Sequence, residues 1–270
     1  CAGCLRFGVI RKVLSVFGKD AVAVHNGGCL GTCATLFPLT AWKIPSFFYT
    51  YSNAGATISG MEVAMKRKGI DAHLIEVAGD GAIFDIGLQT FSAALERGHR
   101  IIYLCYDNQA YMNTGVQSSG STPYGARTKT APKGKPGRVK NIAQIVAAHG
   151  DVYIATASPA YPDDLLKKAK KAKSLNKPSF IHVICPCPPG WEYDPELGIK
   201  IARLGVETGA VVLYEYENGE VTVNKVPKKR KPVEEYLMKQ GRFSHLTKAQ
   251  IAQIQEEVDR EFARLTSGRL

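Results

Sequence analysis

The motif Gly79-Asp80-Gly81 and the later Asn108 each directly follow an apolar run of the chain. If the two runs are neighbouring parallel strands, Asp80 and Asn108 lie side by side where those strands end. Their oxygens are hard ligands, which Mg2+ favours in sites that also hold phosphate groups. The glycines let the backbone approach a diphosphate closely, and a following helix would point its N–H groups at the anion. The motif alone is common in turns, but the pair predicts a site for a divalent cation and a diphosphate.

Cysteines form a second set of reactive side chains. Cys1-Ala-Gly-Cys4 is a CxxC pair, Cys29 follows in a glycine-rich turn, and Cys185 and Cys187 follow an apolar run. Four thiolates collected from turns can bind Zn2+ or hold a [4Fe–4S] cluster, and the spacing suits either. Ordinary buried thiols are the remaining alternative. We expect Cys33, Cys105 and Cys185 to be packed thiols.

Both sets need strands and helices that alternate along the chain. Apolar runs predict strands at residues 21–24, 47–51, 72–78, 100–106, 152–156 and 179–184. Helices are predicted at residues 54–68, 85–97, 141–149 and from Pro162 onward. Such alternation specifies an α/β fold, with a parallel sheet covered by helices on both faces and ligands at the carboxyl ends of the strands. Residues 113–137 read as a long polar loop, a length that is often functional.

The tail has a different pattern. Residues 211–216 and 220–223 flank Glu217-Asn218-Gly219, which predicts a hairpin, and residues 246–265 predict an amphipathic helix. We therefore divide the chain into an α/β domain at 1–210, which carries the cofactor sites, and an extension at 211–270. The extension is expected to pack on the domain or on partner subunits.

Composition excludes several classes. The chain has 270 residues, 45% of them hydrophobic, and a net charge of +11. It lacks an apolar run of membrane-spanning length and a visible signal peptide, so we expect no membrane span and no membrane partner. The charge makes a nucleic-acid-binding protein an alternative, but no nucleic-acid-binding motif accompanies it, and we predict no such partner.

The chain resembles the beta subunit of pyruvate:ferredoxin oxidoreductase and of related 2-oxoacid:ferredoxin oxidoreductases. The resemblance covers nearly the whole chain. It rests on the CxxC pair, on Gly79-Asp80-Gly81, and on the run from Tyr106-Asp-Asn108 to Asn113-Thr-Gly115. Cys187-Pro-Pro-Gly-Trp191 and Gln240-Gly-Arg-Phe243 extend it. It implies a thiamine diphosphate-binding fold of the diphosphate type and an oxidoreductase that decarboxylates a 2-oxoacid.

The resemblance also implies roles for individual residues. The [4Fe–4S] ligands would be Cys1, Cys4, Cys29 and Cys187. Mg2+ would be bound by Asp80, the Asn108 side chain and the Ala110 carbonyl. The diphosphate would meet Gly79, Gly81 and Ala82, and Asn113 would face the reacting carbon. Thiamine diphosphate acts as an electron sink, and a cluster, unlike redox-inactive zinc, could accept the electrons.

Partners follow from the same resemblance. We find no glutamate in a motif that would activate thiamine, and in the family this residue comes from a pyrimidine-binding domain on an alpha subunit. Gamma and ferredoxin-like delta subunits would complete the complex, and ferredoxin would accept the electrons. The oxygen sensitivity that the resemblance implies suggests an anaerobic, cytoplasmic location.

The sequence leaves the substrate open. Gly27-Gly28-Cys29-Leu30-Gly31 replaces a bulkier or acidic group that pyruvate-type relatives carry near the cofactor. The substrate could therefore be pyruvate or a relative such as oxalate. The alternative function is a non-oxidative thiamine diphosphate-dependent decarboxylase with structural zinc.

Overall fold

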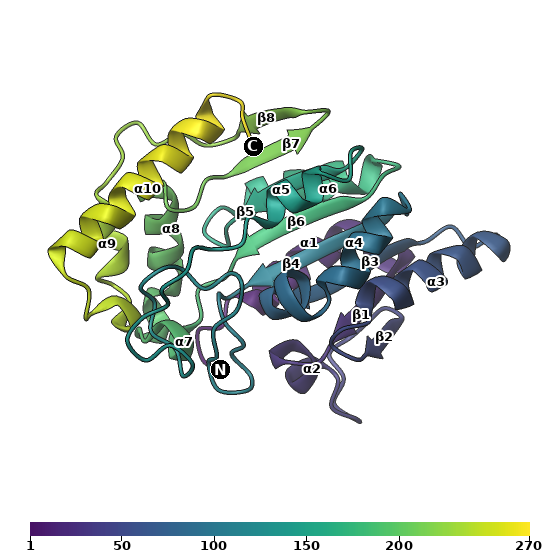
Figure 1. Ribbon diagram of the computed structural model, residues 1–270. Coiled ribbons are helices and arrows are strands. Elements are labelled where there is room, and N and C mark those ends of the chain that lie inside the picture. The colour runs from purple at the N-terminus through teal and green to yellow at the C-terminus, as the bar shows by residue number, and fades with distance from the viewer.

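The computed structural model describes residues 1–270 as one α/β unit built on an eight-stranded sheet (Figure 1). The strand order is β2-β1-β3-β4-β6-β5-β7-β8. The strands are β1 Ala21–Asn26, β2 Ser46–Tyr49, β3 His73–Gly79, β4 Ile101–Asp107, β5 Tyr153–Ala157, β6 Ser179–Ile184, β7 Tyr214–Glu217 and β8 Glu220–Val223. The strands β1 to β6 are mutually parallel, as the alternation of apolar runs predicts.

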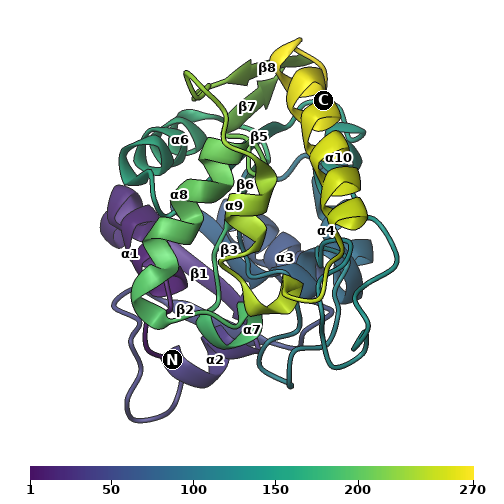
Figure 2. The ribbon, with the colours of Figure 1, turned by 90° about the vertical axis from the view of Figure 1, so that its left-hand side faces the viewer.

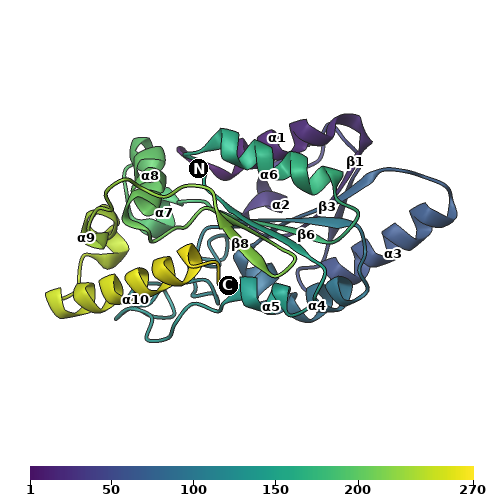
Figure 3. The same ribbon diagram turned by 90° about the horizontal axis from the view of Figure 1, so that it is seen from above.

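The helices cover both faces of this sheet (Figure 3). They are α1 Arg6–Phe17, α2 Cys29–Ala34, α3 Ala54–Arg67, α4 Leu88–Glu96, α5 Ile142–Ala147, α6 Pro162–Ser174, α7 Pro188–Trp191, α8 Gly198–Thr208, α9 Val233–Leu237 and α10 Lys248–Thr266. α1 and α6 lie on one face and α3, α4 and α5 on the other. α1 and α8 were not predicted from sequence, and neither helix has a side-chain cap that would mark its start.

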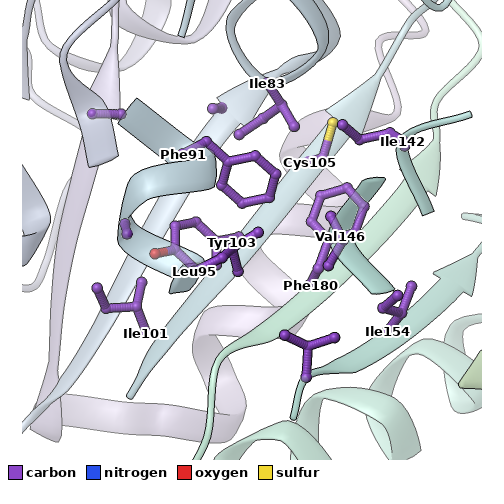
Figure 4. Packing of buried hydrophobic residues seen from close by; sticks show 14 of the residues in the cluster. Ile83, Phe91, Leu95, Ile101, Tyr103, Cys105, Ile142, Val146, Ile154 and Phe180 are labelled. Carbon is purple, nitrogen blue, oxygen red and sulfur yellow. The ribbon is translucent and has the colours of Figure 1, made fainter. Parts of the chain in front are cut away.

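Two apolar cores hold these layers together. On the face of α4 and α5, residues such as Phe91, Tyr103 and Phe180 interlock between the sheet and the helices (Figure 4). The second core packs α1 and α6 against the opposite face. None of the helices is long and apolar enough to cross a membrane.

The hairpin predicted from Glu217-Asn218-Gly219 forms, and it extends the main sheet. β7 pairs antiparallel with β5, and β8 pairs antiparallel with β7. α10 begins at a capping box formed by Thr247 and Gln250 and runs along the edge of the molecule (Figure 2). A smaller third core lies between this tail and α7 and α8. The division of the chain at residue 210 remains a prediction.

One buried carboxyl makes the stability of this fold depend on pH. Glu76 on β3 is 1% exposed, and its only hydrogen bond comes from the Tyr49 hydroxyl at 3.3 Å. Burial raises the pKa of Glu76 to about 8. The folded chain therefore keeps a proton that the unfolded chain releases, and the free energy of unfolding falls as pH rises from about 4.5 to 8.

Glu76→Gln should remove this dependence, because the amide mimics the protonated carboxyl. We expect the variant to melt several degrees above the wild type at pH 9 and close to it at pH 5, with Glu96→Gln, an exposed control, unchanged. Thermal unfolding followed by circular dichroism at both pH values measures this. An equal loss of Tm between pH 5 and 9 in wild type and Glu76→Gln would show that Glu76 is not the cause.

Candidate cofactor site

The adjacent ends of β3 and β4 bring the predicted diphosphate motif together. β3 and β4 pair in parallel with Gly79 opposite Tyr106, so Asp80 and Asn108 follow neighbouring strand ends, as predicted. A cavity of about 180 Å3 opens there. Its lining comprises Gly28, Cys29, Tyr51, Gly79, Asp80, Ile86, Tyr106, Asn108, Ala110, Tyr111, Met112, Asn113 and Thr114.

The predicted diphosphate, cation and substrate residues line this cavity except for two, and of the predicted cluster ligands Cys29 alone lines it. Gly81 and Ala82 are buried behind it, in a π-helical turn at Gly81–Ile86 that precedes α4. A Cβ atom on Gly81 would lie 2.4 Å from the ring of Tyr111, so only glycine lets that ring pack over the turn. The expected helix at 85–97 thus starts later, at Leu88, with the π-helical turn before it.

Three oxygen positions converge at the base of the cavity. The side-chain amide of Asn108 points one terminal atom toward Asp80 and Ala110. That atom lies 3.1 Å from Asp80 Oδ1 and 2.8 Å from the Ala110 carbonyl oxygen. Without a cation, the amide nitrogen of Asn108 occupies this position best, because it donates to both oxygens; with a cation, a rotation of the amide would present Oδ1 instead. Octahedral Mg2+ with ligands at 2.0–2.1 Å holds adjacent oxygens about 3 Å apart. With its amide oxygen turned toward them, Asn108 would therefore complete a ligand set with Asp80 and Ala110 whose spacing suits a magnesium ion.

The charge of Asp80 also fits a cation. Asp80 is 1% exposed, and burial together with the nearby charge of Asp107 raises its pKa well above the usual value. One hydrogen bond, from Ser119 Oγ to Asp80 Oδ2 at 2.5 Å, faces away from Asn108. A divalent cation at the other oxygen would offset the cost of burying this carboxylate.

The turn that carries Asn108 and Ala110 is held by Asp107, which sequence reasoning missed. Asp107 accepts hydrogen bonds from the Gln109 amide at 2.7 Å, from His182 Nε2 at 2.7 Å and from the Ser121 hydroxyl. Gln109 adopts a left-handed backbone with φ of 64°, which is costly for a residue with a side chain. The only sequence signal was the position of Asp107 beside Asn108.

A second, half-buried group of contacts fixes the long loop. Asp85 accepts hydrogen bonds from the Gly120 amide at 2.8 Å and the Tyr111 hydroxyl at 3.2 Å, and pairs with Lys140 at 2.9 Å. These contacts hold residues 111–140 against the turn after Asp80. The loop contains no helix or strand longer than an isolated bridge, as predicted. Asn113, in this loop, is exposed at the cavity, 3.5 Å from the Thr32 hydroxyl.

The predicted cluster ligands lie on the N-terminal segment, α2 and the start of α7, which are neighbours (Figure 2). Cys4, Cys29 and Cys187 are half-buried and Cys1 is exposed. Burial raises the pKa of Cys187 to about 11, and the nearby thiols of Cys4 and Cys29 contribute to that rise. No three metal-ligating His, Cys, Asp or Glu side chains are close enough to hold a metal ion as they stand.

The other cysteines differ in their surroundings. Cys105 and Cys185 are fully packed in the two main cores, as expected of inert thiols. Cys33 does not follow that expectation, because it is exposed on α2 and lies 3.6 Å from the Arg6 guanidinium. Cys187 rather than Cys185 therefore has the accessible sulfur on this segment.

Comparisons with known proteins agree with this geometry. A family model described as "Thiamine pyrophosphate enzyme, C-terminal TPP binding domain" matches residues 26–183. The chain is 51% identical to pyruvate synthase subunit PorB of Methanothermobacter thermautotrophicus over 96% of this chain and 92% of that protein. It is 43% identical to ketoisovalerate oxidoreductase subunit VorB of Pyrococcus furiosus, over 98% of this chain and 89% of that protein.

A solved structure shares the fold. The 2-oxoglutarate:ferredoxin oxidoreductase from Magnetococcus marinus aligns with a TM-score of 0.63 at 19% identity, covering 94% of this chain and 91% of that chain. The family match includes both strand ends that carry the converging oxygens, and the identity to the PorB and VorB subunits extends over nearly the entire chain. The chain is therefore a thiamine diphosphate-binding oxidoreductase subunit that belongs to the beta-subunit family of the 2-oxoacid:ferredoxin oxidoreductases.

Proposed function

We propose that this chain forms half of a site that oxidatively decarboxylates pyruvate or a close relative, with Mg2+ and a [4Fe–4S] cluster beside thiamine diphosphate. When bound, thiamine diphosphate supplies an electron sink and the cluster a one-electron acceptor that leads to ferredoxin. The observation that carries the proposal is one shared cavity, which Asp80, Asn108 and Ala110 line together with Cys29.

The residues of this chain would divide the work as follows. Asp80, Asn108 and Ala110 hold the cation, and the cation holds the diphosphate. Gly79 leaves room for the diphosphate at the strand end. Asn113 offers an amide to the substrate at the mouth of the cavity. Cys1, Cys4, Cys29 and Cys187 would hold the cluster.

The lining supports a small monoanionic substrate. Ile86, Met112 and Tyr51 supply apolar surface, Asn113 and Thr114 are neutral, and neither lysine nor arginine lines the cavity. A second carboxylate, as in oxalate, would find no cationic partner in this half of the site. Gly28 lines the cavity with φ of 82°, so a side chain there would be strained whatever the substrate.

We further propose that an alpha subunit completes the site with its activating glutamate, and that gamma and delta subunits carry electrons onward. The segment between α2 and β2 leaves Leu36, Phe37 and Leu39 exposed, Phe37 almost entirely so. Phe47 and Phe48 on the edge strand β2 are half-exposed. Such apolar surface next to Cys29 suits burial by another subunit.

Turnover assays with the chain alone and with its assembled partners test this proposal. We expect the chain alone to be inactive with any 2-oxoacid, and the assembled enzyme to reduce ferredoxin with pyruvate at least about tenfold faster than with oxalate, a difference of about 1.4 kcal/mol in barrier height. Faster turnover with oxalate than with pyruvate would contradict the proposed substrate. Turnover by the isolated chain would contradict the proposal that another subunit completes the site.

A further inference from the structure

Arg242, in a 3-10 turn at Gly241–Phe243 of the C-terminal tail, is buried without an acidic partner. It is 2% exposed and forms no ion pair. Its guanidinium lies 3.9 Å from the centre of the Trp191 ring and 4.9 Å from that of Phe243. Burying a charge that only aromatic faces and amide oxygens stabilise is costly, so the arrangement calls for an explanation.

The hydrogen bonds of Arg242 lead to the cation-binding turn. Nη2 donates to Gln109 Oε1 at 2.6 Å, and Nε and Nη2 donate to Gln240 Oε1 at 3.0 and 2.8 Å. Gln109 is the residue between Asn108 and Ala110, and it is the one with the left-handed backbone. Arg242 thus anchors the strained residue of the turn whose neighbours supply the converging oxygens.

Trp191, on which Arg242 stacks, contacts the same turn and the cysteine segment. Its indole Nε1 donates to the Asn108 carbonyl at 2.8 Å, and its backbone amide donates to the Cys187 carbonyl at 2.8 Å. Trp191 is fully buried. The tail, the Cys187 segment and the cation-binding turn are therefore linked by a continuous set of contacts.

We infer that Arg242 is a positioning residue: through Gln109 it holds the Asn108 and Ala110 oxygens in the arrangement that binds the divalent cation and the diphosphate. The inference rests on the proposed cation site and adds a function for the C-terminal tail. Outer-shell partners of metal ligands change metal affinity by about 10–100-fold when removed, and we expect a loss of that size.

The chain offers a matched control. Arg230 also belongs to the tail and also stacks on an aromatic ring, 4.6 Å from the centre of Phe262, but its hydrogen bond goes to Asp259 and it has no contact with the turn. Arg230→Met removes a comparable stack and leaves the turn alone. Gln109→Ala removes the acceptor of Arg242, and Gln109→Glu keeps an acceptor of the same shape.

The experiment measures Mn2+ and thiamine diphosphate binding by the assembled, cofactor-depleted enzyme, using the free aqueous Mn2+ signal in room-temperature EPR. We expect Arg242→Met and Gln109→Ala each to raise the Kd by at least tenfold, and the double variant to be no weaker than the worse single variant. Arg230→Met should stay within about threefold, and Gln109→Glu, which keeps the acceptor, should bind more tightly than Gln109→Ala. Saturating cofactor should restore most of the turnover in both weakened variants.

Other results would overturn the inference. If the wild type binds and a folded Arg242→Met binds equally well, or if the losses in Arg242→Met and Gln109→Ala simply add, Arg242 does not act through Gln109. If Arg242→Met does not fold, the Gln109→Ala variant alone tests the inference. An unchanged Kd in Gln109→Ala would then overturn the inference. A wild type that binds no Mn2+ would contradict the proposed cation site itself, which is a separate failure.

Discussion

Asp80→Asn should keep the fold and lose the cofactor. The amide retains an acceptor for Ser119 but removes the only carboxylate among the three converging oxygens. Removing a direct ligand should weaken binding at least as much as removing an outer-shell partner, so we expect a Kd for Mg2+–thiamine diphosphate at least about 100-fold higher. At moderate cofactor concentrations, turnover of the assembled enzyme should fall by a similar factor.

Stability in the absence of cofactor separates this effect from unfolding. Burial of the Asp80 charge is costly, so the cofactor-free Asp80→Asn protein should melt at the wild-type temperature or above it. The wild type should gain about 2.7 kcal/mol of stability at a cofactor concentration 100 times its Kd, and the variant should gain almost none. Asp71→Asn, which alters an exposed carboxylate paired with Arg100 at 3.2 Å, is the control. Wild-type cofactor affinity in Asp80→Asn would refute the assignment of the cation site.

Cys187→Ser should abolish the iron cluster, whereas Cys185→Ser should not. The two thiols are close in sequence but differ in their surroundings. Cys185 is packed in the apolar core between the sheet and the helices α1 and α6, whereas Cys187 is half-buried and lies near Cys4 and Cys29. After anaerobic reconstitution of the assembled enzyme, we expect Cys187→Ser to lack the iron of this chain and its ferredoxin-reducing activity.

A second matched pair lies on α2. Cys29 lines the cofactor cavity, whereas Cys33 is exposed beside Arg6. Iron analysis and the EPR spectrum of the reduced enzyme should therefore change in Cys29→Ser and remain normal in Cys33→Ser. The ligand set would be wrong if Cys33→Ser lost the cluster while Cys29→Ser kept it. It would also be wrong if Cys185→Ser lost the cluster while Cys187→Ser kept it.

The sequence predicted the strand ends well because apolar runs and the residues after them are local features. Two buried runs followed by Asp80 and Asn108 sufficed to predict that these residues meet. The sequence also predicted a hairpin from Asn218-Gly219, but it did not indicate that the hairpin would join β5, since strand pairing depends on the whole sheet.

Supporting contacts could not be predicted in this way. Asp107 meets His182, and Asp85 meets Lys140, only because the parallel sheet and the long loop bring distant segments together. Arg242 reaches Gln109 across 133 positions of the chain. None of these pairs has a local spacing to reveal it, whereas the polar residues at the strand ends do.

The central claim is that a thiamine diphosphate site and an iron–sulfur cluster border one cavity in this subunit. Anomalous diffraction at the iron and zinc edges, from anaerobic crystals of the assembled enzyme with cofactor, tests it most directly. We expect an iron signal enclosed by the sulfurs of Cys1, Cys4, Cys29 and Cys187, and a light cation between Asp80 and Asn108. A zinc signal among these sulfurs, or no metal there at all, would contradict the account.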